Sequence, residues 1–276
     1  MLTLFTNRRV GLESDADRKQ SFAVNSEHHP ITYLSPPAPV NMGDWWFGIA
    51  TEGHFWIRRR FDVMRRLADD FLRSSTCAGE IGCGHGLLQK QVEDFYGIPV
   101  SGFDLNEIAL QRNVSKLSPV YCYDIHQRNP QFDTHFDLLF LFDVLEHIEN
   151  ENEFLQSVKF HLRDSGTLLV NVPAQKFFYS DYDRAAGHVR RYSMDRLEKI
   201  AEENGFKVRA ITYWGLPLVP LLLARKAIPV QRSDGKAGFD TRGSSINHLL
   251  SLLAGCELLP QKFLGTSLLA VLENWR

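Results

Sequence analysis

Several common features are scarce in this chain of 276 residues. It has four cysteines, and no two of them form a C-x-x-C pair: Cys77, Cys83, Cys122 and Cys256. This spacing supports neither a disulfide framework nor a zinc site, and it suits a reducing compartment. The formal net charge is −2, so no excess of one sign attracts the whole molecule to nucleic acid or to an anionic membrane. A local arginine cluster, residues 58–60, lies in a helical pattern and is expected on a solvent-exposed face.

Long hydrophobic runs are also missing. The most apolar stretch, residues 214–224, contains two prolines and is too short to cross a bilayer. The first residues, Met-Leu-Thr-Leu-Phe-Thr-Asn-Arg-Arg, lack the basic-then-apolar order of a signal peptide. We therefore expect a cytoplasmic protein without a transmembrane segment.

The sequence divides into a polar arm and one large domain. Residues 1–43 include a Pro-Pro-Ala-Pro stretch without sustained periodicity, which predicts an extended arm. Within the domain, residues 44–276, short apolar runs alternate with helical patterns, and the runs predict strands at 77–81, 98–103, 120–123, 136–142, 167–172, 206–213 and 267–272. Strands that are apolar on both faces and alternate with helices indicate an α/β fold with a doubly wound, mostly parallel sheet.

A glycine-rich loop follows the first of these strands and precedes a helix, with the sequence Glu80-Ile-Gly82-Cys83-Gly84-His-Gly86. Glycine permits a tight turn and a close approach of a ligand to the backbone. The N-terminus of the following helix offers free N–H groups to a polar ligand. In a dinucleotide fingerprint, G-x-G-x-x-G, the third glycine would fall at Leu87. A purely structural turn is the alternative interpretation.

Acidic residues end the next three predicted strands, at Asp104, at Asp124 and in the segment 142–148, Phe-Asp-Val-Leu-Glu-His-Ile. With the glycine loop, this set resembles class I S-adenosylmethionine-dependent methyltransferases, including their vLEHI signature. Residues 181–193 resemble the D…GH.rrys segment of one subgroup. The resemblance implies a Rossmann-like sheet whose final strand is antiparallel, with residues 214–265 as a helical insertion or lid before that strand.

The resemblance also implies S-adenosylmethionine as cofactor and assigns residues to it. Asp104 would bind the two ribose hydroxyls, because one carboxylate can accept both bonds. Asp124 would meet the adenine amino group, and Glu80 would lie near the methionine end. The remaining implied contacts come from the loop, from apolar side chains around adenine and from the vLEHI turn: Gly82, Cys83, Gly84, Gly86, Leu105, Ile125, Phe142, Val144 and His147.

The methyl acceptor is expected above the carboxyl ends of the strands, where ligands of open α/β sheets bind. His188 could take a proton from a hydroxyl acceptor, and Arg190 and Tyr192 could bind an anionic substrate. Trp56, in an aromatic segment comparable to the subgroup's HWWFxxRR element, could line the pocket. Each has a structural alternative: a loop-ordering histidine, a salt-bridged lid or a packed aromatic helix.

The resulting prediction is a methyltransferase that acts on O, N or C of a small or medium-sized molecule. Oxygen and imidazole groups of Asp143, Glu146 and His147 would suit magnesium or zinc. On the family pattern, however, His147 packs beside the cofactor, and we expect no metal. A nicotinamide-dependent oxidoreductase and a non-catalytic S-adenosylmethionine-binding module are the alternatives. A small-molecule partner is expected and nucleic acid is not; the sequence leaves an oligomer open.

Overall fold

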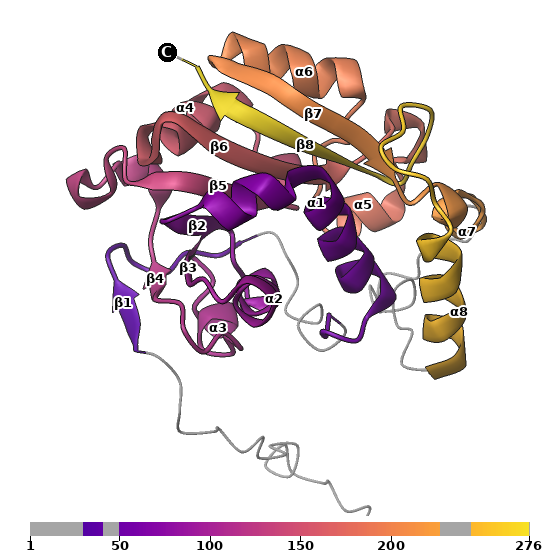
Figure 1. Cartoon of the computed structure of the whole chain (residues 1–276), viewed down its shortest axis with the longest axis horizontal. Helices are drawn as coiled ribbons and strands as arrows, with labels where there is room; N and C mark the ends of the chain where they lie inside the picture. Colours follow the sequence, from indigo (N-terminus) through magenta and orange to yellow (C-terminus); the bar gives the residue numbers. More distant parts are fainter. Residues whose placement is uncertain (1–29, 41–49, 227–243, 276) are drawn as a thin grey trace, which may run out of the picture.

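A mixed sheet of eight strands forms the centre of the computed structural model (Figure 1), which describes residues 30–40, 50–226 and 244–275. The order of the strands is β1-β4-β3-β2-β5-β6-β8-β7. Their bounds are β1 Ile31–Tyr33, β2 Ala78–Ile81, β3 Val100–Asp104, β4 Val120–Cys122, β5 Phe136–Phe142, β6 Leu162–Pro173, β7 Phe206–Trp214 and β8 Ser267–Asn274. The predicted doubly wound α/β fold is confirmed.

Alternating side chains of the central strands feed two separate cores. On β5, Leu139 and Leu141 pack on one face and Leu138 and Phe140 on the other. Successive side chains of a strand point to opposite faces, and this strand is therefore apolar throughout. Helices α4 and α6 cover the first face, and α1 and α2 cover the second (Figure 1). The longer helices are α1 Phe55–Ser74, α2 Leu87–Tyr96, α4 Glu151–His161 and α6 Met194–Glu203.

The final strand is antiparallel, as expected. Strand β8 lies between β6 and β7 and runs antiparallel to both. The other paired strands, from β1 to β6, run parallel to their neighbours. The carboxyl ends of β2, β3, β4 and β5 therefore meet at one edge of the sheet, which is the edge expected to bind ligands.

The N-terminal arm contains a strand that the sequence did not predict. Residues 31–33 form β1, which pairs in parallel with β4 at the edge of the sheet. The prediction of an extended arm over residues 1–43 is incomplete for this reason, and residues 1–29 and 41–43 of that arm lie outside the described part. Three residues are too few to show a strand period in the sequence.

The insertion between β7 and β8 is helical where it is described. It contains η6 Leu216–Leu218, α7 Val219–Lys226 and α8 Ser244–Gly255, and residues 227–243 lie outside the described part. Asn247 of α8 accepts a hydrogen bond from Phe55 N (2.8 Å) and donates one to Gly53 O (2.8 Å). These bonds attach the insertion to the start of α1.

The arginine cluster of α1 corrects one expectation. Arg58 is exposed, but Arg59 and Arg60 are 4% and 7% exposed. Arg59 pairs with Glu257 at 3.3 Å, and Arg60 pairs with Asp143 at 2.5 Å. Two of the three arginines are thus buried because acidic partners distant in the sequence fold against them.

No helix in the described ranges is both long and apolar enough to span a membrane.

Candidate active site

The glycine loop turns sharply against the neighbouring strands. Gly82 and Gly86 have φ values of +74° and +79°, in the left-handed region that glycine adopts most readily. A Cβ atom on Gly82 would lie 2.3 Å from Val144 Cγ2, so the backbone there passes directly beside the turn after β5. Gly82 N and Cys83 N donate to Phe103 O at 2.7 and 3.1 Å, which fixes the loop to β3.

Glu80, on β2 immediately before this loop, is a buried acid with an unused oxygen. Its side chain is 4% exposed, and Oε2 has no hydrogen-bond partner. Burial raises the pKa of Glu80 to about 8, although the nearby guanidinium of Arg60 opposes the shift. A buried carboxyl oxygen without a partner is costly, and a positively charged ligand group at this position would supply the missing partner.

Asp104 ends β3 and holds the loop from the other side. Its Oδ2 accepts from Gly84 N and its Oδ1 from Asn106 N, both at 2.8 Å. Burial raises the pKa of Asp104 despite these two bonds. Since the two carboxylate oxygens together offer about four acceptor sites, Asp104 can still accept further hydrogen bonds. Leu105 beside it is half-buried.

Asp124 and Ile125 follow β4, in contact with the segment after β1. Asp124 Oδ1 accepts from His126 N at 2.9 Å, and Asp124 N donates to Ser35 Oγ at 2.8 Å. Ala38 N also donates to Leu105 O at 3.1 Å. The segment 34–38 therefore borders the predicted adenine side of the site, a contribution that the sequence did not reveal.

The turn after β5 is anchored from both sides. Asp143 has a φ of +58°; its Oδ2 accepts from Arg60 of α1 at 2.5 Å and its Oδ1 from Asn171 of β6 at 2.7 Å. Trp214 Nε1 donates to Asn171 Oδ1 at 2.9 Å. This buried network fixes the direction in which Glu146 and His147 leave the turn.

His188 lies in the segment after β6 and is held by a buried carboxylate. His188 Nδ1 is 3.0 Å from Asp183 Oδ1, and its side chain is 19% exposed. Burial alone would raise the pKa of Asp183, but the hydrogen bond with His188 and the ion pair with Arg191 lower it to about 2. An ionised Asp183 can only accept in this bond, so Nδ1 of His188 carries a proton, and in the neutral form of the ring Nε2 keeps its lone pair.

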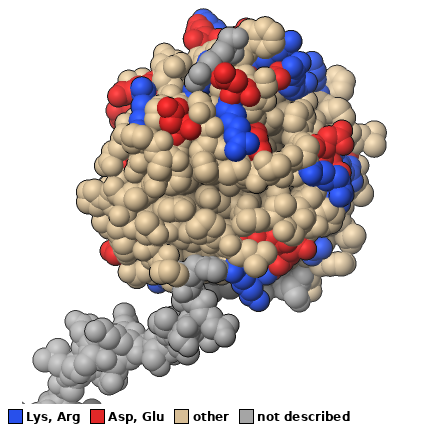
Figure 2. All heavy atoms as spheres, turned by 60° about the vertical axis from the view of Figure 1, so that its left-hand side comes forward, with Lys and Arg blue, Asp and Glu red and all other residues tan. Residues whose placement is uncertain are grey.

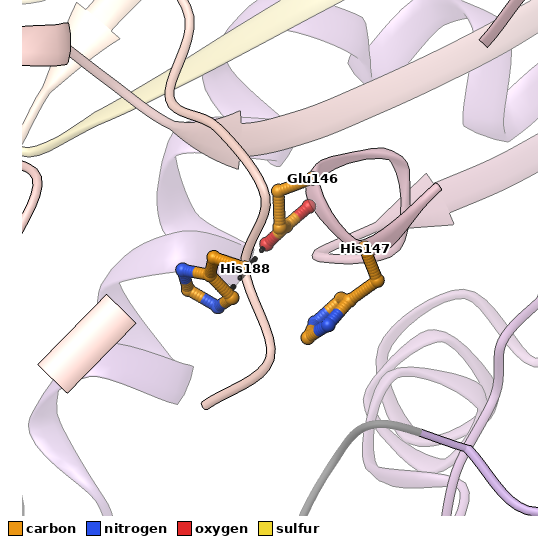
Figure 3. A group of neighbouring side chains, drawn as sticks. All are labelled: Glu146, His147 and His188. Carbon is orange, nitrogen blue, oxygen red and sulfur yellow. Dashed lines mark ion pairs between the residues drawn. The ribbon is translucent and has the colours of Figure 1, made fainter. Parts of the chain in front are cut away.

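His188 faces the turn after β5 (Figure 3). Its Nε2 is 3.9 Å from Glu146 Oε1, and its ring centroid lies 4.9 Å from that of His147 in an edge-on arrangement. His147 Nδ1 donates to Gly187 O at 3.2 Å, and burial lowers the pKa of His147 to about 4. Glu146 is 1% exposed, and burial raises its pKa well above the usual range.

The model of the methyltransferase domain family matches residues 54–211, more than half of the chain. The chain belongs to the methyltransferase domain family.

Curated relatives of this chain include proteins from mycobacteria. A probable S-adenosylmethionine-dependent methyltransferase of Mycolicibacterium smegmatis is 29% identical over 171 residues, which cover 58% of this chain and 62% of that protein. One from Mycobacterium tuberculosis is 27% identical over 159 residues, 55% of this chain and 56% of that protein. The match thus spans about three-fifths of the length of these relatives.

Solved methyltransferase structures share the fold. A SAM-dependent methyltransferase from Archaeoglobus fulgidus superposes with a TM-score of 0.54 at 17% identity, covering 83% of this chain and 98% of that one. Phosphoethanolamine N-methyltransferase 2 from Haemonchus contortus, solved with S-adenosyl-L-methionine, gives 0.52 at 17% identity, covering 82% and 58%. At this level of identity the likeness describes the fold alone.

Within this chain, most of the predicted cofactor residues lie around the carboxyl ends of β2 to β5. Their charges also interact. Besides burial, Asp104 and Asp143 raise the pKa of Glu80 and Arg60 lowers it. His188 in turn lowers the pKa of Asp143, which burial raises. Three apolar members are nearly buried, namely Cys83, Ile125 and Phe142. Cys83 packs into a small core on the β3–β4 side, so only its backbone is available to a ligand.

Two of the three predicted substrate residues have structural partners instead. Tyr192 is completely buried, and its hydroxyl donates to Glu151 Oε1 at 2.5 Å and to Leu145 O at 3.1 Å. Arg190 donates to Ile148 O at 2.5 Å and pairs with Glu151 at 3.0 Å. These contacts favour the salt-bridged lid, the alternative interpretation of the sequence.

Trp56 lies nearer to the site. Its ring is half-buried, 5.6 Å from the ring of Trp214. The Arg60 guanidinium lies 5.0 Å from the Trp56 ring and 5.2 Å from the Phe142 ring. Trp56 therefore borders the buried network behind Asp143, and a contact with substrate stays a prediction.

Proposed function

We propose that this protein is an S-adenosylmethionine-dependent methyltransferase whose acceptor is a small or medium-sized molecule. The observation that carries the proposal is the meeting of four strand ends at one edge of the sheet, where Glu80, Asp104, Asp124 and the turn 142–147 surround the glycine loop. Ligands of open α/β sheets bind at such an edge.

The residues present fit the proposed cofactor. Glu80 Oε2 lacks a partner and suits the ammonium of the methionine end. Asp104 retains acceptor capacity for two ribose hydroxyls. Half-buried Leu105 and the edge of Ile125 offer apolar surface to the adenine ring. Gly82 and Gly84 are partly exposed and carry no Cβ, so a ligand can approach the loop backbone closely.

The cofactor, when bound, supplies an electrophilic methyl group attached to a sulfonium. The chain's own residues hold the two reactants, and positioning of this kind contributes roughly 7–11 kcal/mol. His188 presents the Nε2 lone pair, because Asp183 fixes the proton on Nδ1. We assign His188 to activation of the methyl acceptor, by removing a proton where the acceptor is a hydroxyl.

The insertion between β7 and β8 is proposed as the cover of the acceptor pocket. Its helix α8 bonds to the start of α1, next to Trp56, and Glu257 pairs with Arg59. Active-site lids of this kind exclude water, which favours a reaction in which positive charge disappears.

The charge pattern of one face supports a small acceptor over nucleic acid. On the face drawn in Figure 2, Lys and Arg atoms lie among Asp and Glu atoms, and no continuous basic area is visible there. All four cysteines are free thiols, which suits a reducing compartment; we place the protein in the cytoplasm.

Isothermal titration with S-adenosylmethionine tests the proposal. We expect one site per chain and a loss of at least tenfold in affinity for Asp104→Ala, while Asp94→Ala, an exposed acid on α2, binds like the natural protein. A melting-temperature screen with NADH distinguishes the oxidoreductase alternative. Stabilisation by NADH alone would refute the proposal, and so would unchanged affinity in Asp104→Ala.

A further inference from the structure

Three metal-binding side chains meet beside the proposed cofactor edge. Glu146 and His147 come from the turn after β5, and His188 comes from the segment after β6. One ligand atom from each lies within 4.8 Å of the other two. Figure 3 shows the Glu146 carboxyl group and the His188 ring turned toward one another, with the His147 ring beside them. Two segments far apart in the sequence thus deliver two imidazoles and one carboxyl group to one place.

Both histidines are held in the tautomer that a metal requires. His188 Nδ1 donates to the Asp183 carboxylate at 3.0 Å, and His147 Nδ1 donates to Gly187 O at 3.2 Å. Each ring therefore keeps its Nε2 lone pair. Metal-binding histidines almost always donate their other ring N–H to a carboxylate or a backbone carbonyl, and this chain provides one of each.

Glu146 provides a second, independent observation. Its side chain is 99% buried, Oε1 lies 3.9 Å from His188 Nε2, and Oε2 has no hydrogen-bond partner. That separation is too long for a hydrogen bond. A carboxyl oxygen buried beside two imidazoles without a bonded partner is costly, and a cation among the three would supply the missing interaction.

Neighbouring carboxylates are already engaged. Asp143 accepts from Arg60 and Asn171, and Asp183 accepts from His188, Arg191 and Ser180. Glu146, in contrast, retains a buried oxygen without a hydrogen-bond partner.

We propose that Glu146, His147 and His188 bind a divalent transition-metal ion. Two imidazoles and one carboxylate are a ligand set that suits zinc or iron. Metal–ligand distances of about 2.0–2.2 Å separate two ligands by roughly 3–4 Å, so side-chain movements of about 1 Å complete the site. This proposal replaces the expectation of no metal drawn from the sequence.

The catalytic consequence rests on the proposed function. Three protein ligands leave coordination positions open, and a hydroxyl oxygen of the acceptor fits such a position. A divalent ion held there would lower the pKa of that hydroxyl, and its proton would pass to water before the methyl transfer. The O–CH₃ bond forms as the S–CH₃ bond breaks and its electron pair returns to sulfur. His188 is then a ligand, and the acceptor class is narrowed to alcohols and phenols.

Zinc titration of chelator-treated protein tests the site directly. We expect one Zn²⁺ per chain by calorimetry and elemental analysis. His188→Ala and His147→Ala should each lose at least tenfold in affinity, and Asp183→Asn about 10–100-fold through the altered orientation of His188. His135→Ala, an exposed histidine at the opposite end of β5, is the matched control and should bind zinc normally.

Cobalt gives a second measurement, because the visible absorption of bound Co²⁺ reports the metal site in the natural protein itself. The visible absorption of bound Co²⁺ should appear in the natural protein and in His135→Ala, and be lost in His188→Ala. Absence of stoichiometric binding, or binding equal in all variants, would overturn the site. S-adenosylmethionine affinity, measured on the natural protein and on His188→Ala, reports the proposed function separately, because His188 is not among the residues assigned to the cofactor.

Discussion

Glu80 offers a quantitative test of how the proposed cofactor is held. In the free protein its pKa is about 8, so at pH 7 about 90% of the molecules carry a protonated, neutral Glu80. An ammonium group placed beside Oε2 favours the ionised form and lowers this pKa. Binding of S-adenosylmethionine should therefore release close to one proton at pH 7, and about 0.1 proton at pH 9, where Glu80 is already ionised.

The released proton is measured by calorimetry in buffers of different ionisation enthalpy. Glu80→Gln cannot release this proton, and its difference from the natural protein separates Glu80 from the α-amino group of the ligand, which titrates nearby. Glu107→Gln, a partly exposed acid at the same edge, is the control and should release the proton. Equal proton release by the natural protein and Glu80→Gln would refute the reasoning.

The raised pKa of Glu80 also makes the stability of the protein depend on pH. An acid whose pKa is raised from 4.5 to about 8 in the folded state binds more protons folded than unfolded between these values. The free energy of unfolding contributed by Glu80 therefore falls as pH rises from 4.5 to 8, by at most about 5 kcal/mol in total. Glu80→Gln should remove this slope in urea denaturation measured across that range.

Two further predictions concern the frame of the site. Gly82→Ala places a Cβ atom 2.3 Å from Val144 Cγ2 at a φ of +74°. We expect a loss of about 2–4 kcal/mol in unfolding free energy together with weaker cofactor binding. The double variant with Val144→Ala should recover only part of the lost stability, because the strain of the positive φ remains. Arg60→Met leaves Asp143 buried without its cation and should cost about 3–5 kcal/mol in urea unfolding, whereas adding Asp143→Asn should restore much of it. Additive effects in either pair would contradict these contacts.

The sheet and the glycine loop could be predicted because both have local signals. Buried parallel strands are apolar on both faces, and residues 136–142 were predicted with the bounds that β5 has. The order of acids along the chain follows the order of strand ends, so Asp104 and Asp124 could be assigned to one edge before their contacts were known.

Other features depend on partners that are remote in the sequence. Arg60 and Asp143 are 83 residues apart, and Arg59 and Glu257 are 198 apart, so the arginine cluster 58–60 was predicted on a solvent-exposed face. The buried hydroxyl of Tyr192 shows the same limit, since only the fold brings Glu151 to it. The tautomers of His147 and His188 likewise follow from tertiary contacts alone.

The central claim is that one edge of the sheet binds S-adenosylmethionine between the glycine loop, Asp104, Asp124 and the turn after β5. A crystal structure of the protein with S-adenosylhomocysteine tests it most directly. We predict that the ribose hydroxyls lie within hydrogen-bond distance of the Asp104 carboxylate. We also predict that the amino nitrogen of the ligand lies within about 3.5 Å of a Glu80 carboxylate oxygen, the longest donor–acceptor distance of a hydrogen bond. A ligand bound at another surface, or with its ribose away from Asp104, would contradict the account.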